Sequence, residues 1–483
     1  MAYHATNLVF ALAGLLAAVA AFDNTCNDNL AVYWGQNSYG AANAGQTAGY
    51  QQPINYYCQD DTIDVIPVAF VDVFYGTGGL PELNLANTCS SVTQPVFNGT
   101  GLANCQFLAS DIEACQAAGK IVTISLGGAG GSVGFSSDTD GQQFADTIWN
   151  LFLGGTSDTR PFGDAVLDGV DLDIEAGTST GYAAFVTQLR TYFEGASKEY
   201  YVSGAPQCPY PDAYLGSVIN AADFDMIYVQ FCKSQYMSLD NNPCGLQNFN
   251  TSSDWDYGIW DYWATNVSPN PDVKIYIGAP ASSTASGTGY QDAVTFGSIL
   301  QTTQMNFPSF GGAMLWDASQ AYANNRYDQS SKGYMTTAGT CDQAFQYQTC
   351  NAPAYVSGQS YTGGDTVTYQ GYVWQAKWWT ENTPASDPNG DWSAIMACTG
   401  TGTSGTPTTT ATTPPTSSAP ATGSCAGVAA WDSSSVYTDG DQVTYDGDLW
   451  TAQWWTEGDT PGGSAGVWTD NGACTSIAGR MLF

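Results

Sequence analysis

Three carboxylates recur at every second position of a short apolar stretch. In LDGVDLDIE (residues 167–175), these acids are Asp171, Asp173 and Glu175. A strand sends alternate side chains to opposite faces, so the three acids share one face, about 6.5–7 Å apart along the strand. Burial and crowding raise the pKa of at least one carboxylate, so one acid can stay protonated beside an ionised neighbour. The pattern indicates acid–base chemistry.

The same stretch also fits an edge strand with a solvated acidic face. Against this, Val166, Val170, Leu172 and Ile174 share the opposite face and favour a covered strand. Asp168 points to that apolar face, so we expect it to have a structural role, such as a hydrogen bond to a following loop.

Histidine is nearly absent, which excludes several kinds of catalysis. The single histidine, His4, lies in a predicted signal peptide. Ser-His-Asp and Cys-His catalysis and histidine-ligated zinc are therefore excluded. Carboxylates and tyrosines remain for proton transfer. We expect no metal and no cofactor.

The formal net charge is −34, with 10 Lys plus Arg against 44 Asp plus Glu. This balance argues against nucleic acid or an anionic membrane as a partner. Residues 1–21 contain a short apolar run that ends in small residues, which predicts a signal peptide and a mature chain from about Phe22. No second segment is apolar enough to span a bilayer.

An oxidising, extracellular location is expected from the cysteine content. The chain has 13 Cys, and such numbers are typical of secreted proteins. Asn98, Asn250 and Asn266 stand in glycosylation acceptor sequences. We therefore expect a secreted, extracellular glycoprotein, and association with a cell wall is compatible with this expectation.

Eight apolar runs predict the strands of one large domain, residues 22–345. They are residues 29–34, 63–74, 120–126, 165–175, 200–206, 224–231, 273–280 and 311–317. Helical segments such as 142–153 and 182–193 lie between them. The alternation favours an α/β fold, a (β/α)₈ TIM barrel whose active site lies at the carboxyl ends of the strands. A doubly wound open sheet is the alternative.

Two copies of one motif follow the predicted barrel. YTGGDTVTYQGYVWQAKWWTENTP (361–384) matches YTDGDQVTYDGDLWTAQWWTEGDTP (437–461) at an offset of 76 residues. They define a first repeat, residues 346–398, and a second repeat, residues 425–475, separated by a Thr/Ser/Pro-rich linker, 399–424, and followed by a tail, 476–483. Each repeat is a small β-rich module that needs a disulfide staple. Its flanking cysteines, Cys350 and Cys398 or Cys425 and Cys474, are the candidates.

Several motifs together resemble glycoside hydrolase family 18, and within it the class III chitinases of fungi and plants. The motifs are DGVDLDIE (168–175), SLGG (125–128), AVYWGQN (31–37), APQCPYPD (205–212) and GGAMLWD (311–317). The resemblance implies substrate-assisted catalysis on chitin, an exception to the scheme of two catalytic carboxylates. It implies that Glu175 protonates the glycosidic oxygen, Asp173 stabilises the oxazolinium intermediate, and Asp171 interacts with Asp173.

The resemblance also implies binding residues and disulfides. Trp316 matches the sugar-stacking floor of the family, and Tyr33, Phe70 and Gln230 are further candidates for the cleft. Taken without the family, Trp316 is as compatible with a core position. The implied disulfides are Cys58–Cys115, Cys89–Cys105 and Cys208–Cys244, with Cys26–Cys341 joining the ends of the barrel.

One segment departs from the family pattern. After the sixth strand the family has a tyrosine that hydrogen-bonds the acetamido carbonyl, but this chain has Cys232 there, followed by extra residues. Tyr236 lies within this insertion and is the candidate substitute. Cys232 is also left as the odd thiol. We expect the insertion to reduce turnover strongly.

The repeats resemble the chitin-binding modules of carbohydrate-binding families 5 and 12. Adjacent residues on a strand face opposite ways, so one tryptophan of each pair is expected in the core and the other exposed for stacking on sugar rings. The candidates for sugar binding are Trp378, Trp379, Trp454, Trp455, Tyr355 and Trp431, whereas Trp374 and Trp450 are expected in the core. Two tethered modules would raise the effective concentration on an insoluble polymer.

The sequence thus favours a secreted, monomeric, endo-acting chitinase that binds chitin and N-acetylglucosamine oligomers. Two alternatives stay open. One is a lectin-like chitin-binding protein with impaired catalysis, and the other is an endo-β-N-acetylglucosaminidase acting on N-glycans.

Overall fold

The computed structural model describes most of the chain before the linker and part of the chain after it. The described residues are 21–231, 244–249, 251, 254–338, 341, 344–385 and 390–400, then 425, 428–433, 435–437, 442–452, 456–457, 460–463 and 467–474. The predicted signal peptide up to residue 20, Cys232, Tyr236, Asn250, Trp454, Trp455 and the tail lie outside them. Two compact units divide at Thr406/Pro407, within the predicted linker.

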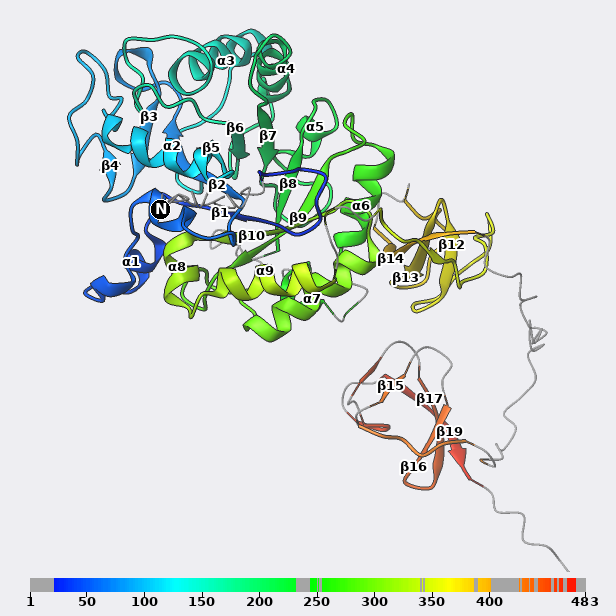
Figure 1. Cartoon of the computed structure of the whole chain (residues 1–483). Helices are drawn as coiled ribbons and strands as arrows, with labels where there is room; N and C mark the ends of the chain where they lie inside the picture. Colours follow the sequence, from blue (N-terminus) through cyan, green and yellow to red (C-terminus); the bar gives the residue numbers. More distant parts are fainter. Residues whose placement is uncertain are drawn as a thin grey trace, which may run out of the picture. The chain divides into compact units, whose positions relative to one another are not determined.

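Eight parallel strands form a closed barrel in the first unit (Figure 1). They are β1 (Asn29–Val32), β2 (Val65–Val73), β5 (Ile121–Gly127), β6 (Gly169–Asp173), β7 (Tyr201–Gly204), β8 (Met226–Gln230), β9 (Lys274–Pro280) and β10 (Phe310–Trp316). The strand order is β1-β10-β9-β8-β7-β6-β5-β2, and the pairing of Ala31 with Val65 joins β1 to β2. This closure confirms the predicted TIM barrel and excludes the open sheet.

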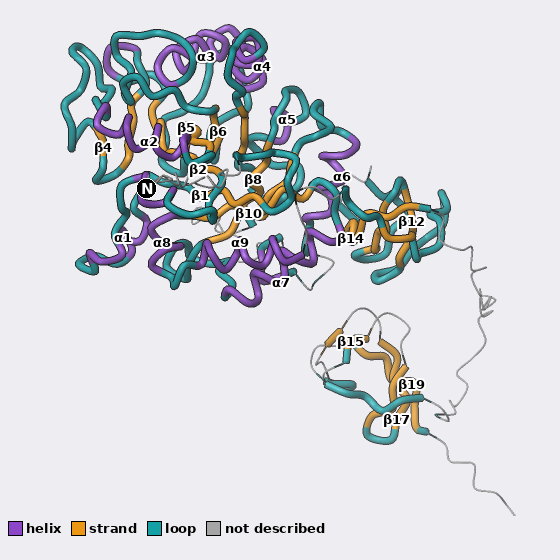
Figure 2. The backbone as a smooth tube through the Cα atoms, in the orientation of Figure 1, coloured by secondary structure: helices purple, strands orange, loops and turns teal. Residues whose placement is uncertain are grey.

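Helices surround the barrel (Figure 2). They are α1 (Ser38–Ala42), α2 (Ala109–Ala117), α3 (Asp138–Phe152), α4 (Tyr182–Phe193), α5 (Gly216–Ile219), α6 (Tyr257–Asn266), α7 (Ala293–Asn306), α8 (Ala318–Ala323) and α9 (Tyr327–Ala338). Short 3₁₀ helices lie at Thr47–Gly49, Ile54–Cys58, Thr77–Gly79, Gln106–Leu108 and Leu246–Asn248. Helix α3 begins four residues before the predicted segment because the Ser137 side chain accepts a hydrogen bond from the Asp140 amide, an N-cap.

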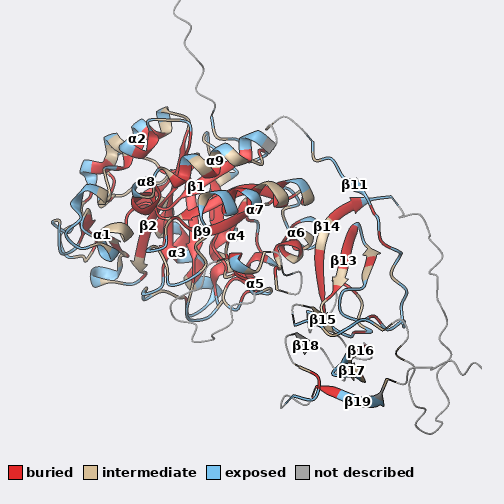
Figure 3. Cartoon of the chain, turned by 90° about the horizontal axis from the view of Figure 1, so that it is seen from below, coloured by how far each residue is buried: buried red, intermediate tan, exposed pale blue. Residues whose placement is uncertain are grey.

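The barrel has two apolar layers, one inside and one outside the ring of strands. Strand residues such as Val170 and Leu172 face outward and pack under the helices, while Tyr33, Phe70, Tyr228 and others fill the interior. The buried strands lie within a shell of helices whose outward faces are exposed (Figure 3). Because alternate residues of β6 point inward, the acids of this strand enter the interior.

Strands β3 (Glu82–Leu85) and β4 (Cys89–Ser90) extend the sheet from β2 in antiparallel orientation. This arm was not predicted. The disulfides in the described structure are Cys26–Cys341, Cys58–Cys115, Cys89–Cys105, Cys208–Cys244, Cys350–Cys398 and Cys425–Cys474. These are the pairings expected from the sequence and the family resemblance.

The first repeat is a four-stranded sheet in the same unit as the barrel. Its strands are β11 (Gln348–Thr349), β12 (Thr366–Tyr369), β13 (Tyr372–Ala376) and β14 (Trp392–Thr399), in the order β11-β14-β13-β12. The second repeat, in the other unit, contains β15 (Val436–Tyr437), β16 (Gln442–Tyr445), β17 (Asp448–Ala452), β18 (Thr456–Glu457) and β19 (Trp468–Ala473). Strand β15 pairs with β18, and β16-β17-β19 form a second sheet.

The tryptophan pair of the first repeat differs from the prediction. Trp378 and Trp379 are 49% and 61% exposed, so neither is a core residue. The expectation of one buried tryptophan was wrong because β13 ends at Ala376 and strand alternation does not extend to the pair. Trp374 is fully buried as expected, whereas Trp450 is only half-buried.

Among the described residues, no helix combines the length and the apolar character that crossing a bilayer requires.

Candidate active site

Asp171, Asp173 and Glu175 line up at the carboxyl end of β6. Asp171 is fully buried, Asp173 nearly so, and Glu175 follows the strand at the wall of an open cavity. This is the arrangement that the alternating pattern predicted. The carboxyl ends of barrel strands are where enzymes of this fold place their catalytic residues.

Asp171 is held by hydroxyl donors from three other strands or strand ends. Its Oδ2 accepts from the Tyr33 hydroxyl at 2.7 Å and from the Ser125 hydroxyl at 2.6 Å, and its Oδ1 accepts from Ser203 at 2.8 Å. Burial raises the pKa of Asp171, and these three hydrogen bonds offset part of that rise. Tyr33 therefore positions Asp171 as well as lining the cavity.

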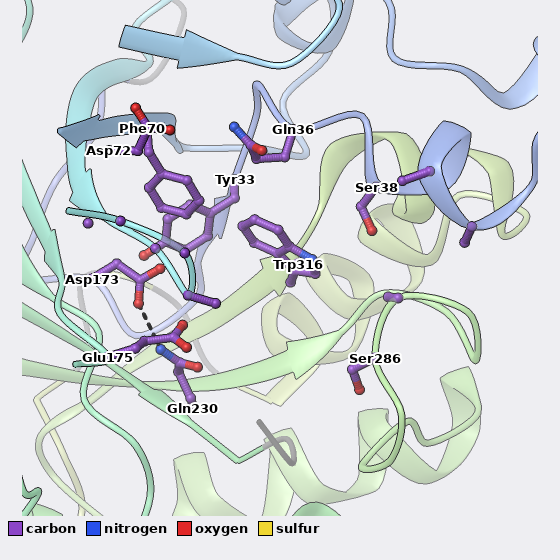
Figure 4. Close-up of a pocket in the computed structure, with 18 of the residues that line it drawn as sticks. Tyr33, Gln36, Ser38, Phe70, Asp72, Asp173, Glu175, Gln230, Ser286 and Trp316 are labelled. Carbon is purple, nitrogen blue, oxygen red and sulfur yellow. Dashed lines mark hydrogen bonds between the residues drawn. The ribbon is translucent and has the colours of Figure 1, made fainter. Parts of the chain in front are cut away.

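Asp173 lies between Asp171 and Glu175. Gln230, the last residue of β8, donates from Nε2 to Asp173 Oδ1 at 2.9 Å and to the Ala205 carbonyl at 2.9 Å. In Figure 4 the Asp173, Glu175 and Gln230 side chains point toward one another. Gln230 thus orients the pair from the neighbouring side of the barrel.

The pKa values of both outer acids are raised. Burial raises the pKa of Asp173 well above its usual range, and the charges of Glu175 and Asp171 raise it further. Burial also raises the pKa of Glu175, and hydrogen bonds with Gln230 and Asp173 offset part of that rise. Both shifts favour the protonated form of a carboxyl in this pair, compared with an isolated acid.

Asp168 has the structural role expected for the opposite face. Its carboxylate accepts from the Val122 amide at 2.7 Å and from Gln116 Nε2 at 2.8 Å. It also pairs with Lys198 at 2.8 Å. These partners tie β6 to β5, to α2 and to the segment before β7.

The cavity beside the acids has a volume of about 710 Å³ and an aromatic wall. Trp316, the last residue of β10, is half-buried, and its ring stacks on Phe70 at a centroid distance of 5.8 Å and an interplanar angle of 17°. Tyr33 lies 5.5 Å from Trp316 between ring centroids. All three line the cavity (Figure 4). Trp316 is therefore a cavity residue, and the core interpretation does not hold.

The glycines of SLGG bring strands close to the acids. A Cβ on Gly127, whose φ is +120°, would lie 2.1 Å from the carbonyl oxygen of Asp173. A Cβ on Gly128, whose φ is +83°, would lie 2.8 Å from the Phe70 ring. These positions require glycine both for the turn after β5 and for the packing.

Sequence reasoning missed the polar wall at the β2 side of the cavity. Gln36, Asp72 and Asn84 line it, and Asn84 Nδ2 donates to Asp72 Oδ2 at 3.0 Å. Asp72 could have been predicted from the sequence, because it stands two residues after the cleft candidate Phe70 and strand alternation puts both on the same face. Asn84 had none, because it comes from the unpredicted arm β3. Ser38, Thr284 and Ser286 form part of the opposite wall.

No catalytic metal is indicated by the described residues. The single cluster of candidate ligands among them is Asp23 with Cys26 and Cys341, and these cysteines form a disulfide.

The sugar-binding candidates of the repeats fall in three groups. Trp378 and Trp379 are exposed together, and Trp378 Nε1 donates to Asp391 at 2.6 Å. Tyr355 is half-buried and stacks on Tyr361, and Trp431 of the second repeat is half-buried against Tyr445. Trp454 and Trp455 lie outside the described residues.

A closed (β/α)₈ barrel with a row of coupled carboxyls in an aromatic-walled cavity is an architecture that glycoside hydrolases use. A sequence model of Glycosyl hydrolases family 18 matches residues 29–387, and a model of Carbohydrate-binding module family 5/12 matches residues 430–469. The chain therefore belongs to glycosyl hydrolase family 18.

Named relatives agree with this membership. The chain is 47% identical over 317 residues to Chitinase 1 of Rhizopus niveus, covering 65% of this chain and 59% of that protein. It is 44% identical over 337 residues to Chitinase 2 of Rhizopus oligosporus, covering 69% of this chain and 58% of that protein. The chain thus spans less than two thirds of the length of these relatives.

Among solved structures, a chitinase from Ipomoea carnea superimposes with a TM-score of 0.50 at 31% identity, covering 63% of this chain and 99% of that chain.

Proposed function

We propose that the chain is a secreted, monomeric, endo-acting chitinase that cleaves β-1,4 bonds with retention of configuration. The observation that carries this proposal is the row Asp171–Asp173–Glu175 at the wall of an aromatic-lined cavity. Membership of family 18 and the chitinase names of the relatives support the substrate class.

In the proposed reaction, the substrate supplies the nucleophile. Glu175 donates its proton to the glycosidic oxygen as the bond to the anomeric carbon breaks. The carbonyl oxygen of the 2-acetamido group attacks that carbon and forms an oxazolinium ion. The Glu175 carboxylate then takes a proton from water, whose oxygen opens the ring on the original face.

The other residues of the row act on charge and orientation. Asp173 stabilises the positive oxazolinium ion and orients the acetamido group, and Gln230 holds Asp173 in place. Asp171, fixed by Tyr33, Ser125 and Ser203, adds negative charge beneath Asp173. Trp316 offers its ring face to a pyranose. An acetamido nucleophile requires an N-acetylated sugar, which favours chitin over cellulose.

Both repeats are proposed to bind insoluble chitin. The family 5/12 match supports this for the second repeat, and the shared tryptophan pair extends it to the first. Secretion is supported by the predicted signal peptide and the six disulfides. The glycosylation candidates Asn98 and Asn266 are exposed.

Glu175→Gln tests the assignment of the acid. We expect kcat on a soluble chitin oligomer to fall by about 10²–10⁴-fold, because general acid–base catalysis is lost. Glu113→Gln, a change at an exposed position of α2, is the matched control and should keep wild-type turnover. NMR of the first product should show the β-anomer. Turnover of Glu175→Gln equal to that of the control, or an α-anomer, would contradict the proposal.

A further inference from the structure

One face of helix α6 is covered by the first repeat instead of by water. Gly258, Asp261, Tyr262 and Thr265 follow helical spacing and share this face. The residues of α6 that pack into the barrel core are Tyr257, Trp260, Trp263 and Ala264. An outward carboxylate on a barrel helix is normally solvated, yet Asp261 is 0% exposed.

Asp261 is buried because the repeat supplies one of its hydrogen-bond donors. The Tyr372 hydroxyl of β13 donates to Asp261 Oδ2 at 2.6 Å. The Ser309 amide donates to Oδ1 at 2.8 Å, and the Ser309 hydroxyl donates there too. Tyr372 also lies 2.8 Å from Thr265 Oγ1. Since an unpaired buried carboxylate is costly, these bonds hold the repeat to α6.

The two surfaces also fit sterically. A Cβ on Gly258 would lie 1.9 Å from the carbonyl oxygen of Ala394 in β14, so only glycine allows this approach. Tyr262 packs its ring 5.5 Å from both Tyr372 and Trp374, between centroids. Glycine is unfavourable within a helix, and the contact with β14 accounts for its presence. Figure 1 shows β14 beside α6.

The second repeat has acids at the positions that make these contacts. Tyr372 pairs with Ala397 and Trp374 with Ala394, as Asp448 pairs with Ala473 and Trp450 with Asp470. In the first repeat, Gln370 also accepts a hydrogen bond from the Tyr262 hydroxyl. The equivalents of Gln370, Tyr372 and Ala394 are therefore Asp446, Asp448 and Asp470. Carboxylates there would repel the buried Asp261. Both copies keep the tryptophan pair. The copies therefore differ in the residues for docking, which means contact with α6, and not in the proposed sugar-binding pair.

Docking fixes where the first tryptophan pair stands. Helix N-termini in a (β/α)₈ barrel lie at the end that carries the active site, and α6 follows β8, whose Gln230 lines the cavity. Asp256 is the N-cap residue of α6, and the Lys377 charge offsets part of the pKa rise that burial causes at Asp256. Lys377 precedes Trp378 directly. The exposed pair is therefore anchored beside the catalytic end of the barrel.

We propose that the first repeat is a fixed part of the catalytic unit, which holds the Trp378–Trp379 face against insoluble chitin at a set position relative to the cleft. The fixed position follows from the contacts with α6. The role toward the polymer rests on the proposed function. The second repeat is the tethered binder.

Hydrogen exchange in the full chain tests the docking. Tyr372→Asp copies the residue of the second repeat, and Gly258→Leu breaks the interface from the barrel side without changing the repeat. We expect the amides of 257–266 to exchange about tenfold faster in both variants, because the helix loses its cover. Asp448→Tyr, which places the tyrosine of the first repeat in the second repeat, is the control. In this variant the amides of 257–266 should exchange at the wild-type rate. Unchanged exchange in both interface variants would overturn the docking.

Hydrolysis of two substrates tests the role toward the polymer. In both interface variants, we expect turnover of a soluble chitin oligomer to stay within about twofold of the wild-type value. Hydrolysis of insoluble chitin should fall about fivefold or more, because the Trp378–Trp379 face is no longer held at a set position relative to the cleft. Loss of docking without a change in the ratio of the two activities would overturn this role. A wild-type chain inactive on both substrates would refute the proposed function and the polymer role with it, while the exchange measurement would still decide the docking.

Discussion

Asp171 in the barrel interior and Asp261 beneath the first repeat are built alike. Both are 0% exposed, and each accepts hydrogen bonds from three donors, one of which is a tyrosine hydroxyl. Burial raises the pKa of each. In both places, a carboxylate joins segments that are distant in the sequence.

The two aspartates differ in what stands beside them. Asp171 begins a row of acids that continues through Asp173 to Glu175 at an open cavity. Asp261 accepts hydrogen bonds from Tyr372 and Ser309, and the Lys274 ammonium lowers its pKa. No second acid is among the groups with the largest effect on that pKa. A buried, hydrogen-bonded aspartate thus supports proposed catalysis at Asp171, where further acids lead to an open cavity. At Asp261, which is enclosed, it holds the first repeat to α6.

The largest expected effect separates the two regions by activity. Asp173→Asn should lower kcat on a soluble chitin oligomer by about 10²–10⁴-fold, because the oxazolinium ion loses its counter-charge. Asp261→Asn is the matched change and should keep kcat within about twofold while lowering the free energy of unfolding. Steady-state kinetics and chemical denaturation measure both quantities. A similar loss of kcat in both variants would show that the comparison is wrong.

A second experiment concerns the insertion that follows β8. Replacing residues 232–240 by a single tyrosine restores the family pattern after β8. We expect kcat to rise by about tenfold or more, since a hydrogen-bond donor to the acetamido carbonyl would be regained. Replacing the same residues by a single phenylalanine is the control, because it shortens the segment without supplying the hydroxyl. An equal rise in both replacements, or none in either, would contradict the role assigned to the hydroxyl.

A third expected effect, on stability instead of activity, is a pH dependence at the interface. Burial raises the pKa of Asp261 to about 6. Between its unfolded value of about 3.9 and this value, the folded state binds the proton more tightly, so stability from this group is lost as pH rises through the window. The loss amounts to about 2–3 kcal/mol. Asp261→Asn should lack this slope in denaturation from pH 4 to pH 7. If the free energy of unfolding changed with pH in the same way in the wild type and in Asp261→Asn, the raised pKa of Asp261 would be contradicted.

Much of the barrel was predictable because its strands are apolar runs bounded by polar segments. The run at 165–175 revealed both the strand and the acid row, since alternation alone separates Asp171 from Leu172. Helix α4 matches its predicted segment at both ends. Closure of the sheet followed from the number of alternating elements.

The remaining features depend on tertiary contacts that leave no local signal. Asn84 reaches the cavity from an arm that pairs antiparallel with β2. The sequence around Asp261 is that of an ordinary outward acid of a helix, and its contacts with Ser309 and Tyr372 are made by residues distant in the sequence. The exposure of both Trp378 and Trp379 depends on where β13 ends. Position in the sequence could not supply these facts.

The disulfide Cys26–Cys341 has a consequence for cleavage of the chain. It brings the two Cα atoms within 4.4 Å and closes a covalent ring of 315 residues in sequence separation. A protease that cuts one loop of this ring releases no fragment, because both pieces stay joined through sulfur.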